Sequence, residues 1–193
     1  LRLFVDSGIL SFHTSQRSPS RSVLDYWQHL PAGESLLITT ADHPLLTTEM
    51  IDYFCSAAVH SDADVILGIV SATLLRARYP QSRRTFIRLR GESFCGTNLF
   101  ALRDPQAVAA VQFWTRAEQF RKKPWRLAGV FGPLNLVLFA LRRFDLAAAV
   151  RRASRVIGAR IAVVEMPFAE CAIDVDSPSD LALASRILAE RER

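Results

Sequence analysis

The sequence predicts an α/β layered fold with a mostly parallel sheet, in one domain that spans residues 1–193. Short apolar, β-branched runs alternate along the chain with longer amphipathic stretches, which is typical of strands connected by helices. The length suits a single domain with a substantial core, and 50% hydrophobic against 22% charged residues is typical of a globular chain. There is no internal repeat or low-complexity tract.

The expected strands are six apolar runs bounded by turn-forming residues. They comprise residues 3–5, 35–40, 64–70, 85–89, 98–102 and 160–165. Gly91 and Gly96 are expected to form tight turns just before the strand that begins at Asn98.

Helical patterns fall between most of these strands. They comprise residues 22–30, 47–59, 104–120, 145–158 and 177–193. Thr47, Asp104, Asp145 and Ser177 stand where N-caps are preferred, and Gly158 stands where a helix ends in glycine.

Residues 116–143 are the least regular part of the chain, because glycines and a proline interrupt an apolar run between basic clusters. Two interpretations are open. The segment is either an ordinary helical hairpin on the sheet, or a helical insertion that acts as a lid or makes peripheral membrane contact through its arginine rim.

The net charge of +5 and the pI of about 9.6 favour an anionic ligand. No nucleic-acid-binding module accompanies this charge, so we expect no nucleic-acid partner. The three cysteines, Cys55, Cys95 and Cys171, have neither zinc-site nor disulfide spacing, which predicts a cytoplasmic location.

Acidic residues follow two of the predicted strands. Asp42 lies two residues beyond the strand at 35–40, where open parallel sheets bind ligands. Asp174 and Asp176 lie two apart in an extended segment and therefore point to one side. Together the three carboxylates suit Mg²⁺, which takes one or two carboxylates together with substrate phosphates. The competing interpretation is that each aspartate only caps a turn or a helix.

Two further polar groups lie between these carboxylates in the sequence. Asn98 suits a hydrogen bond to a hydroxyl-rich substrate, or it closes a turn. The run Arg83, Arg84, Arg88 and Arg90 suits phosphate binding, or it is an ordinary charged surface.

Three motifs, "TADHPLL", "GTNLFAL" and "IDVDSPSDL", resemble in order the strand-end motif, glycine–asparagine loop and C-terminal element of MobA-like NTP transferases, a group similar to the molybdenum-cofactor guanylyltransferase. The resemblance covers about residues 1–190. It implies a Rossmann-like three-layer nucleotidyltransferase fold, like that of type-A glycosyltransferases. It also implies a Mg²⁺-dependent enzyme that moves an NMP group from a nucleoside triphosphate to a phosphorylated small-molecule or lipid acceptor and releases pyrophosphate.

The resemblance implies specific roles for residues of this chain. The catalytic residues would be Asp42 and Asp176, and the metal ligands would be Asp42, Asp174 and Asp176. The nucleotide and acceptor contacts would be Ser20, Ser22, Thr40, Ala41 and Asn98.

The chain departs from the family at its N-terminal side, because the glycine-rich loop with Arg and Lys that cradles the triphosphate has no counterpart here. We therefore expect an N-terminally incomplete domain. Ala41 also replaces the usual glycine before Asp42. Two alternatives stay open: a type-A-fold glycosyltransferase, although "DADV" at residues 62–65 precedes a strand instead of following one, and a non-catalytic relative that acts as a partner- or membrane-binding module.

Overall fold

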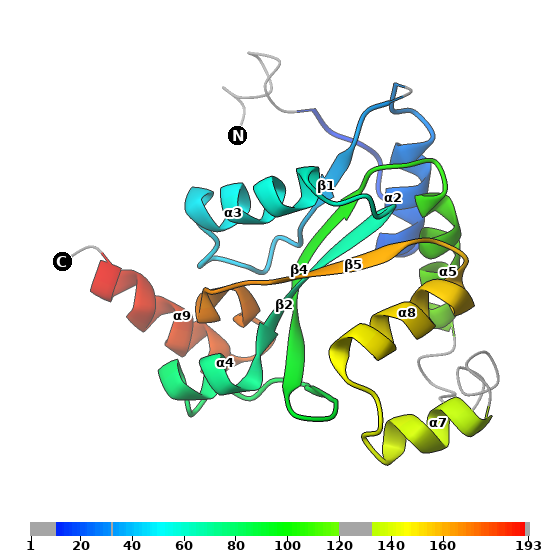
Figure 1. The fold of residues 1–193 in the computed structure, drawn as a ribbon. Coiled ribbons are helices and arrows are strands. Elements are labelled where there is room, and N and C mark those ends of the chain that lie inside the picture. Colours follow the sequence, from blue (N-terminus) through cyan, green and yellow to red (C-terminus); the bar gives the residue numbers. More distant parts are fainter. Residues whose placement is uncertain (1–10, 32, 120–132, 192–193) are drawn as a thin grey trace.

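The computed structural model describes residues 11–31, 33–119 and 133–191, which form an open sheet with helices on both faces (Figure 1). The strands are β1 (Leu36–Ile38), β2 (Val65–Ser71), β3 (Ile87–Arg88), β4 (Ser93–Leu102) and β5 (Ile161–Glu165). Each overlaps an expected run. The remaining expected strand, residues 3–5, lies outside the described residues.

The sheet has the strand order β1-β4-β2-β5, and β3 pairs with β4 beside this path. Strands β1, β2, β3 and β5 share one direction, and β4 runs against them. The expected α/β, Rossmann-like fold is therefore confirmed, with most strands running the same way. Because the reversed β4 lies between β1 and β2, β2–β5 is the one parallel pair among the described strands.

Helices connect the strands and cover the sheet (Figure 1). They are α2 (Pro19–Trp27), α3 (Thr48–Val59), α4 (Ala72–Arg78), α5 (Ala107–Gln119), α7 (Pro133–Ala140), α8 (Leu146–Ile157) and α9 (Pro178–Arg191), with a 3₁₀ turn η1 (Ala169–Ala172). Thr47 and Asp145 cap α3 and α8 as expected, and Gly158 ends α8 at φ 81°. The short α4 had no counterpart among the expected helices.

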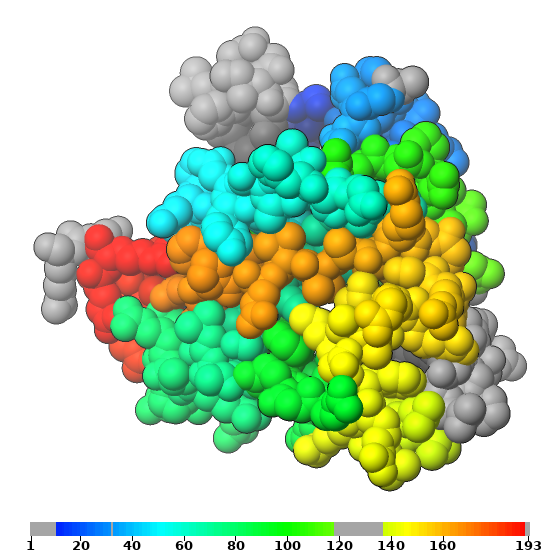
Figure 2. Space-filling view, in the orientation of Figure 1, coloured from blue at the N-terminus to red at the C-terminus, as the bar shows by residue number. Residues whose placement is uncertain are grey.

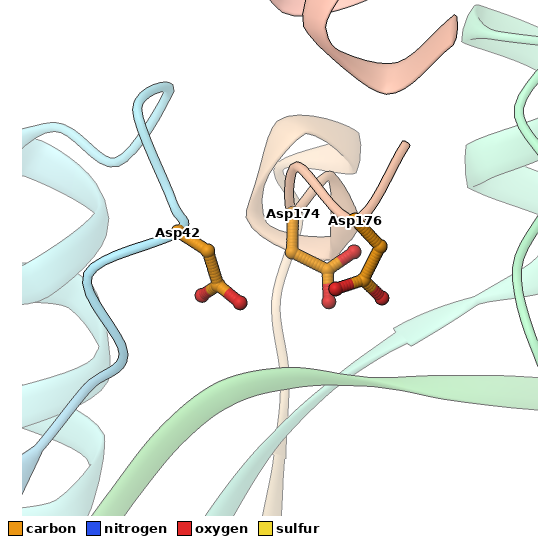
Figure 3. A group of neighbouring side chains, drawn as sticks. All are labelled: Asp42, Asp174 and Asp176. Carbon is orange, nitrogen blue, oxygen red and sulfur yellow. The ribbon is translucent and has the colours of Figure 1, made fainter. Parts of the chain in front are cut away.

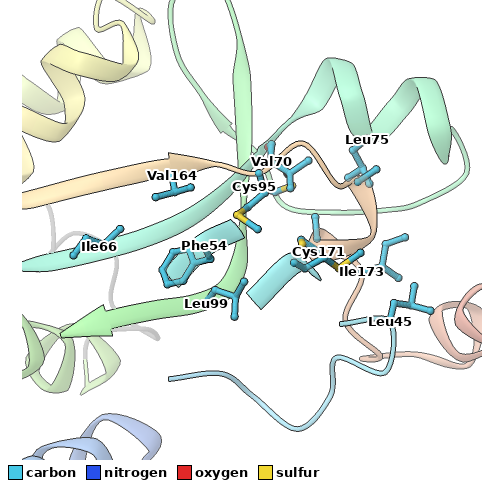
Figure 4. Packing of buried hydrophobic residues seen from close by; sticks show 14 of the residues in the cluster. Leu45, Phe54, Ile66, Val70, Leu75, Cys95, Leu99, Val164, Cys171 and Ile173 are labelled. Carbon is cyan, nitrogen blue, oxygen red and sulfur yellow. Dashed lines mark hydrogen bonds between the residues drawn. The ribbon is translucent and has the colours of Figure 1, made fainter. Parts of the chain in front are cut away.

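The alternation of side chains along β2 divides the core into two layers. Ile66 and Val70 face a large apolar cluster with α3, η1 and α9, where Phe54 and Leu99 are fully buried (Figure 4). Val65 faces the opposite layer, where α2 and α5 pack. Helices thus cover both faces, as a three-layer architecture requires. The edge strand β5 lies at the surface between α3 and α8 (Figure 2).

The start of β4 differs from the expectation of a strand beginning at Asn98. The strand begins at Ser93, because Gly91, at φ 91°, turns the chain so that β3 and β4 pair as a hairpin. Gly96 therefore forms no turn; it lies inside β4 opposite Ile69.

A bulge interrupts β4 in its middle. Leu67 of β2 pairs with Phe100, but Ile69, two residues on, pairs with Gly96, so β4 accommodates two extra residues. Asn98 lies in this bulge with φ 52°, a left-handed conformation that asparagine tolerates better than most residues. On its other edge, β4 pairs with β3 only up to Phe94 and with β1 only from Phe100. The bulge thus faces the chain that leaves β1.

Candidate metal and ligand site

Three carboxylates meet beside the bulge of β4. One oxygen from each of Asp42, Asp174 and Asp176 lies within 4.8 Å of the other two (Figure 3). Asp42 and Asp174 are half-buried, and Asp176 is exposed. The expectation that these three carboxylates act together agrees with this geometry.

The loop after β1 positions Asp42. β1 ends at Ile38, and the Thr40 hydroxyl donates a hydrogen bond to the Asp42 carboxylate. The carbonyl oxygen of Asp42 accepts the backbone N–H of Val175 at 2.9 Å. This backbone bond joins the two loops that carry the cluster, so the positions of Asp42 and of Asp174 to Asp176 are set together.

The start of α9 holds the other end of the acidic loop. The Ser177 hydroxyl accepts the backbone N–H of Asp180 at 3.3 Å and donates to the Asp180 carboxylate at 2.5 Å. The cap expected at Ser177 is therefore present. In Figure 3 the Asp42 carboxylate points toward the loop that carries Asp174 and Asp176, and the carboxylates of these two residues lie next to each other.

Arg84 brings a largely enclosed guanidinium to the site. Its guanidinium is 2.6 Å from the Asp174 carboxylate and 3.2 Å from the Asp180 carboxylate, and it also donates to the Asp174 carbonyl at 2.7 Å. The side chain is only 9% exposed. Arg84 therefore neutralises carboxylate charge within the site and is not an exposed phosphate-binding arginine. Arg90, by contrast, forms an exposed ion pair with Asp145.

Asn98 reaches the cluster from the bulge of β4. Its amide nitrogen lies 3.3 Å from Asp174 Oδ2 and 3.0 Å from His43 Nε2. The amide nitrogen only donates, so His43 Nε2 accepts and the imidazole is neutral, with its proton on Nδ1. Burial lowers the pKa of His43, against the opposing effect of Asp174 and Asp42, which agrees with a neutral ring.

The other predicted contact residues have different surroundings. Thr40 and Ala41 are exposed beside Asp42. Ser20 is fully buried, where its hydroxyl is 3.1 Å from Ser18 Oγ and accepts from Thr115 of α5 at 3.0 Å. The Ser22 hydroxyl accepts the backbone N–H of Gln16 and donates to the carbonyl oxygen of Ser18. Nucleotide contacts by these two serines stay a prediction.

The segment at 116–143 is described only in part, because residues 120–132 lie outside the described residues. Its described part includes α7, where Val137 and Phe139 are exposed and Leu141 follows just beyond the helix. Within the described chain, no helix is both long and apolar enough to cross a bilayer.

The donor chemistry of the cluster fits a hard divalent cation. Carboxylate oxygens are ligands of Mg²⁺, and oxygens on opposite sides of this ion stand about 4 Å apart. The oxygens of the cluster have a comparable spread, and the exposed Asp176 leaves an open side for water or phosphate.

Sequence reasoning did not separate the roles of Arg84 and His43 from those of their neighbours. Arg84 stands in a run of arginines, and only its burial distinguishes it. His43 follows Asp42 directly, and its contact with Asn98 depends on a bulge that no sequence pattern indicates.

Four chains of solved structures match this fold. One is a hypothetical transferase from Thermus thermophilus, which has 29% sequence identity and a TM-score of 0.77 over 86% of this chain and 71% of the Thermus chain. No family model and no curated protein matches this sequence. The chain is therefore similar to a transferase fold, and the comparisons point to no narrower family.

Proposed function

We propose that this chain is a Mg²⁺-dependent nucleotidyltransferase domain, which moves an NMP group from a nucleoside triphosphate to an acceptor phosphate. The observation that carries the proposal is the meeting of Asp42, Asp174 and Asp176 at one edge of the sheet. Similarity to a hypothetical transferase supports transfer chemistry in general. The sequence motifs around the three aspartates support a nucleotidyl group as the group that is transferred.

The transfer is a displacement at phosphorus. An oxygen of the acceptor phosphate attacks the α-phosphorus, a new P–O bond forms, and the bond to the bridging oxygen breaks as pyrophosphate leaves. Bound Mg²⁺ would supply neutralisation of phosphate charge. The residues of the chain position the carboxylates, because the backbone hydrogen bond between Asp42 and Val175 fixes the distance between the two acidic loops.

Arg84 and Asn98 act on Asp174 in this proposal. Arg84 holds one Asp174 oxygen and the Asp174 carbonyl, and Asn98 donates to the other oxygen. Asp174 is therefore oriented before any ligand arrives. Asp42 and the exposed Asp176 are the carboxylates more available for the ion, and they are the pair that we assign to catalysis.

The first test is the melting temperature of the chain with CTP, GTP, ATP and UTP, each with and without Mg²⁺. A ligand present at 100 times its Kd stabilises the folded state by about 2.7 kcal/mol, which raises the melting temperature by about 5–10 °C. We expect a Mg²⁺-dependent rise with at least one nucleotide.

Variants connect that rise to the site. Asp42→Asn and Asp176→Asn should remove it while leaving the fold nearly unchanged. Asp62→Asn, which neutralises an exposed carboxylate outside the cluster, is the matched control and should keep the rise. A Mg²⁺-dependent rise that survives both cluster variants would contradict the proposed site.

The exposed residues of α7 suit a second, peripheral contact. We propose that α7, with Arg142 and Arg143 just beyond it, touches an anionic membrane surface, which would bring a lipid-linked acceptor within reach. A cytoplasmic location stays part of this proposal.

A further inference from the structure

A pocket with a volume of about 440 Å³ lies between the sheet and α5. β1, β2, β4 and the start of β5 form one wall, α5 forms the other, and Ile157 at the end of α8 adds to the lining. This volume is within the range of small-molecule sites, and it holds on the order of 15 non-hydrogen atoms if each takes about the 30 Å³ of a liquid water.

The described side chains that line this pocket are apolar apart from the Asn98 amide and the indole N–H of Trp114. Among the described residues that line it, Asn98 is the only one with a polar amide, hydroxyl or charged side chain. Phe100 of β4 and Trp114 of α5 stack with ring centroids 5.7 Å apart and form an aromatic wall. Such a lining suits a hydrocarbon or aromatic group and offers little to a sugar.

Asn98 connects the pocket to the carboxylate cluster. It lines the pocket, and its amide donates to Asp174. The bulge makes this possible, since the left-handed backbone at Asn98 departs from the regular alternation of a strand. A molecule in the pocket would therefore have its polar end beside Asn98 and Asp174.

We propose that this pocket binds the apolar body of the acceptor, so that the acceptor is a phosphate monoester of an apolar alcohol of about ten carbon atoms. This inference rests on the proposed function and gives it a substrate class. The hydrocarbon lies against Phe100 and Trp114, and the phosphate stands near Asn98, beside the carboxylates that would hold the metal. The monoester oxygen then attacks the α-phosphorus, and pyrophosphate leaves.

The test measures binding of geranyl phosphate to the full 193-residue chain by calorimetry, with ribose 5-phosphate as the polar comparison. We expect geranyl phosphate to bind at least tenfold more tightly. Equal binding of the two phosphates would overturn the proposal.

Pocket-filling variants locate the binding. Ala110→Leu and Ala117→Leu each place a larger side chain in the pocket from α5, and either one should weaken geranyl phosphate about tenfold or more. Gln112→Leu adds the same side chain at an exposed position of the same helix and should leave the affinity for geranyl phosphate unchanged. Circular dichroism establishes which variants fold, and two positions guard against the failure of one.

Tryptophan fluorescence gives an independent readout. Geranyl phosphate should change the emission of the wild-type chain, and Trp114→Phe should abolish that change. A folded pocket-filling variant with wild-type affinity, or a fluorescence change that survives Trp114→Phe, would overturn the proposal. A nucleotide-dependent stabilisation with no pocket-dependent geranyl phosphate binding would overturn only the acceptor class. The converse result, pocket-dependent binding without any nucleotide effect, would support the pocket and count against the transferase.

Discussion

The close approach of β2 and β4 at Gly68 is a sensitive point of the fold. A Cβ added at Gly68 would lie 2.2 Å from Thr97 Oγ1 and 3.3 Å from Leu99 Cβ. Non-bonded heavy atoms normally stay about 3.5 Å apart, so a group must move by about 1 Å. Thr97 is only 1% exposed and lies at the bulge of β4, where little space is available.

Gly68→Ala should therefore destabilise the chain. Overpacking of a buried site lowers the free energy of unfolding by about 1–3 kcal/mol. The reduced conformational freedom of the unfolded chain offsets about 0.4–1 kcal/mol of this loss. The net loss is about 1–2 kcal/mol in the free energy of unfolding. For a chain of this length that loss lowers the melting temperature by about 2–8 °C.

The assay is urea unfolding followed by circular dichroism, with Gly96→Ala as the matched control. Gly96 lies in the neighbouring strand, and nothing is within 4 Å of its added Cβ, so that variant should be neutral or slightly stabilised. Thr97→Ala removes the clashing hydroxyl, which has no hydrogen-bond partner among the described residues. The double variant Gly68→Ala with Thr97→Ala should recover about 1 kcal/mol relative to additivity. Equal stability of Gly68→Ala and Gly96→Ala, or the absence of any recovery, would refute this reasoning.

Three further predictions concern charge and exposure. Hydrogen bonds from Arg160 lower the pKa of the fully buried Asp64, so this carboxylate stabilises the fold above about pH 4 and ceases to do so as the pH falls through its lowered pKa. Asp64→Asn should therefore lower the free energy of unfolding by about 2 kcal/mol at pH 7, measured by urea unfolding, and the variant should lose less stability in acid than wild type. Arg84→Gln leaves two poorly exposed carboxylates without their cation and should cost about 3 kcal/mol, and Mg²⁺ should restore more stability to this variant than to wild type, which thermal melts measure. Phe139→Ser should weaken cosedimentation with anionic vesicles, and wild type should not bind zwitterionic ones, whereas unchanged cosedimentation would place the contact elsewhere.

The sequence alone predicted most of the elements and singled out the three carboxylates as candidates. Alternation of side chains, caps such as Thr47 and Asp145, and the glycine at Gly158 act over a few residues, so local patterns predicted most helices and strands near their observed places. Asp42, Asp174 and Asp176 stood out because each lies just beyond an expected strand or before an expected helix. The order of the motifs was also enough to predict a Rossmann-like fold.

Only the tertiary structure decided how these pieces meet. The direction of β4, the two extra residues of its bulge and the left-handed backbone of Asn98 result from pairing with β2, which lies about 30 positions away in sequence. The burial of Arg84 and the pocket beside Asn98 depend on the same long-range packing. Local propensities act on neighbouring residues, whereas a site is assembled by contacts between segments that are distant in the chain. Those contacts enclosed Arg84 and left its neighbouring arginines exposed, and they placed an apolar pocket next to the three carboxylates.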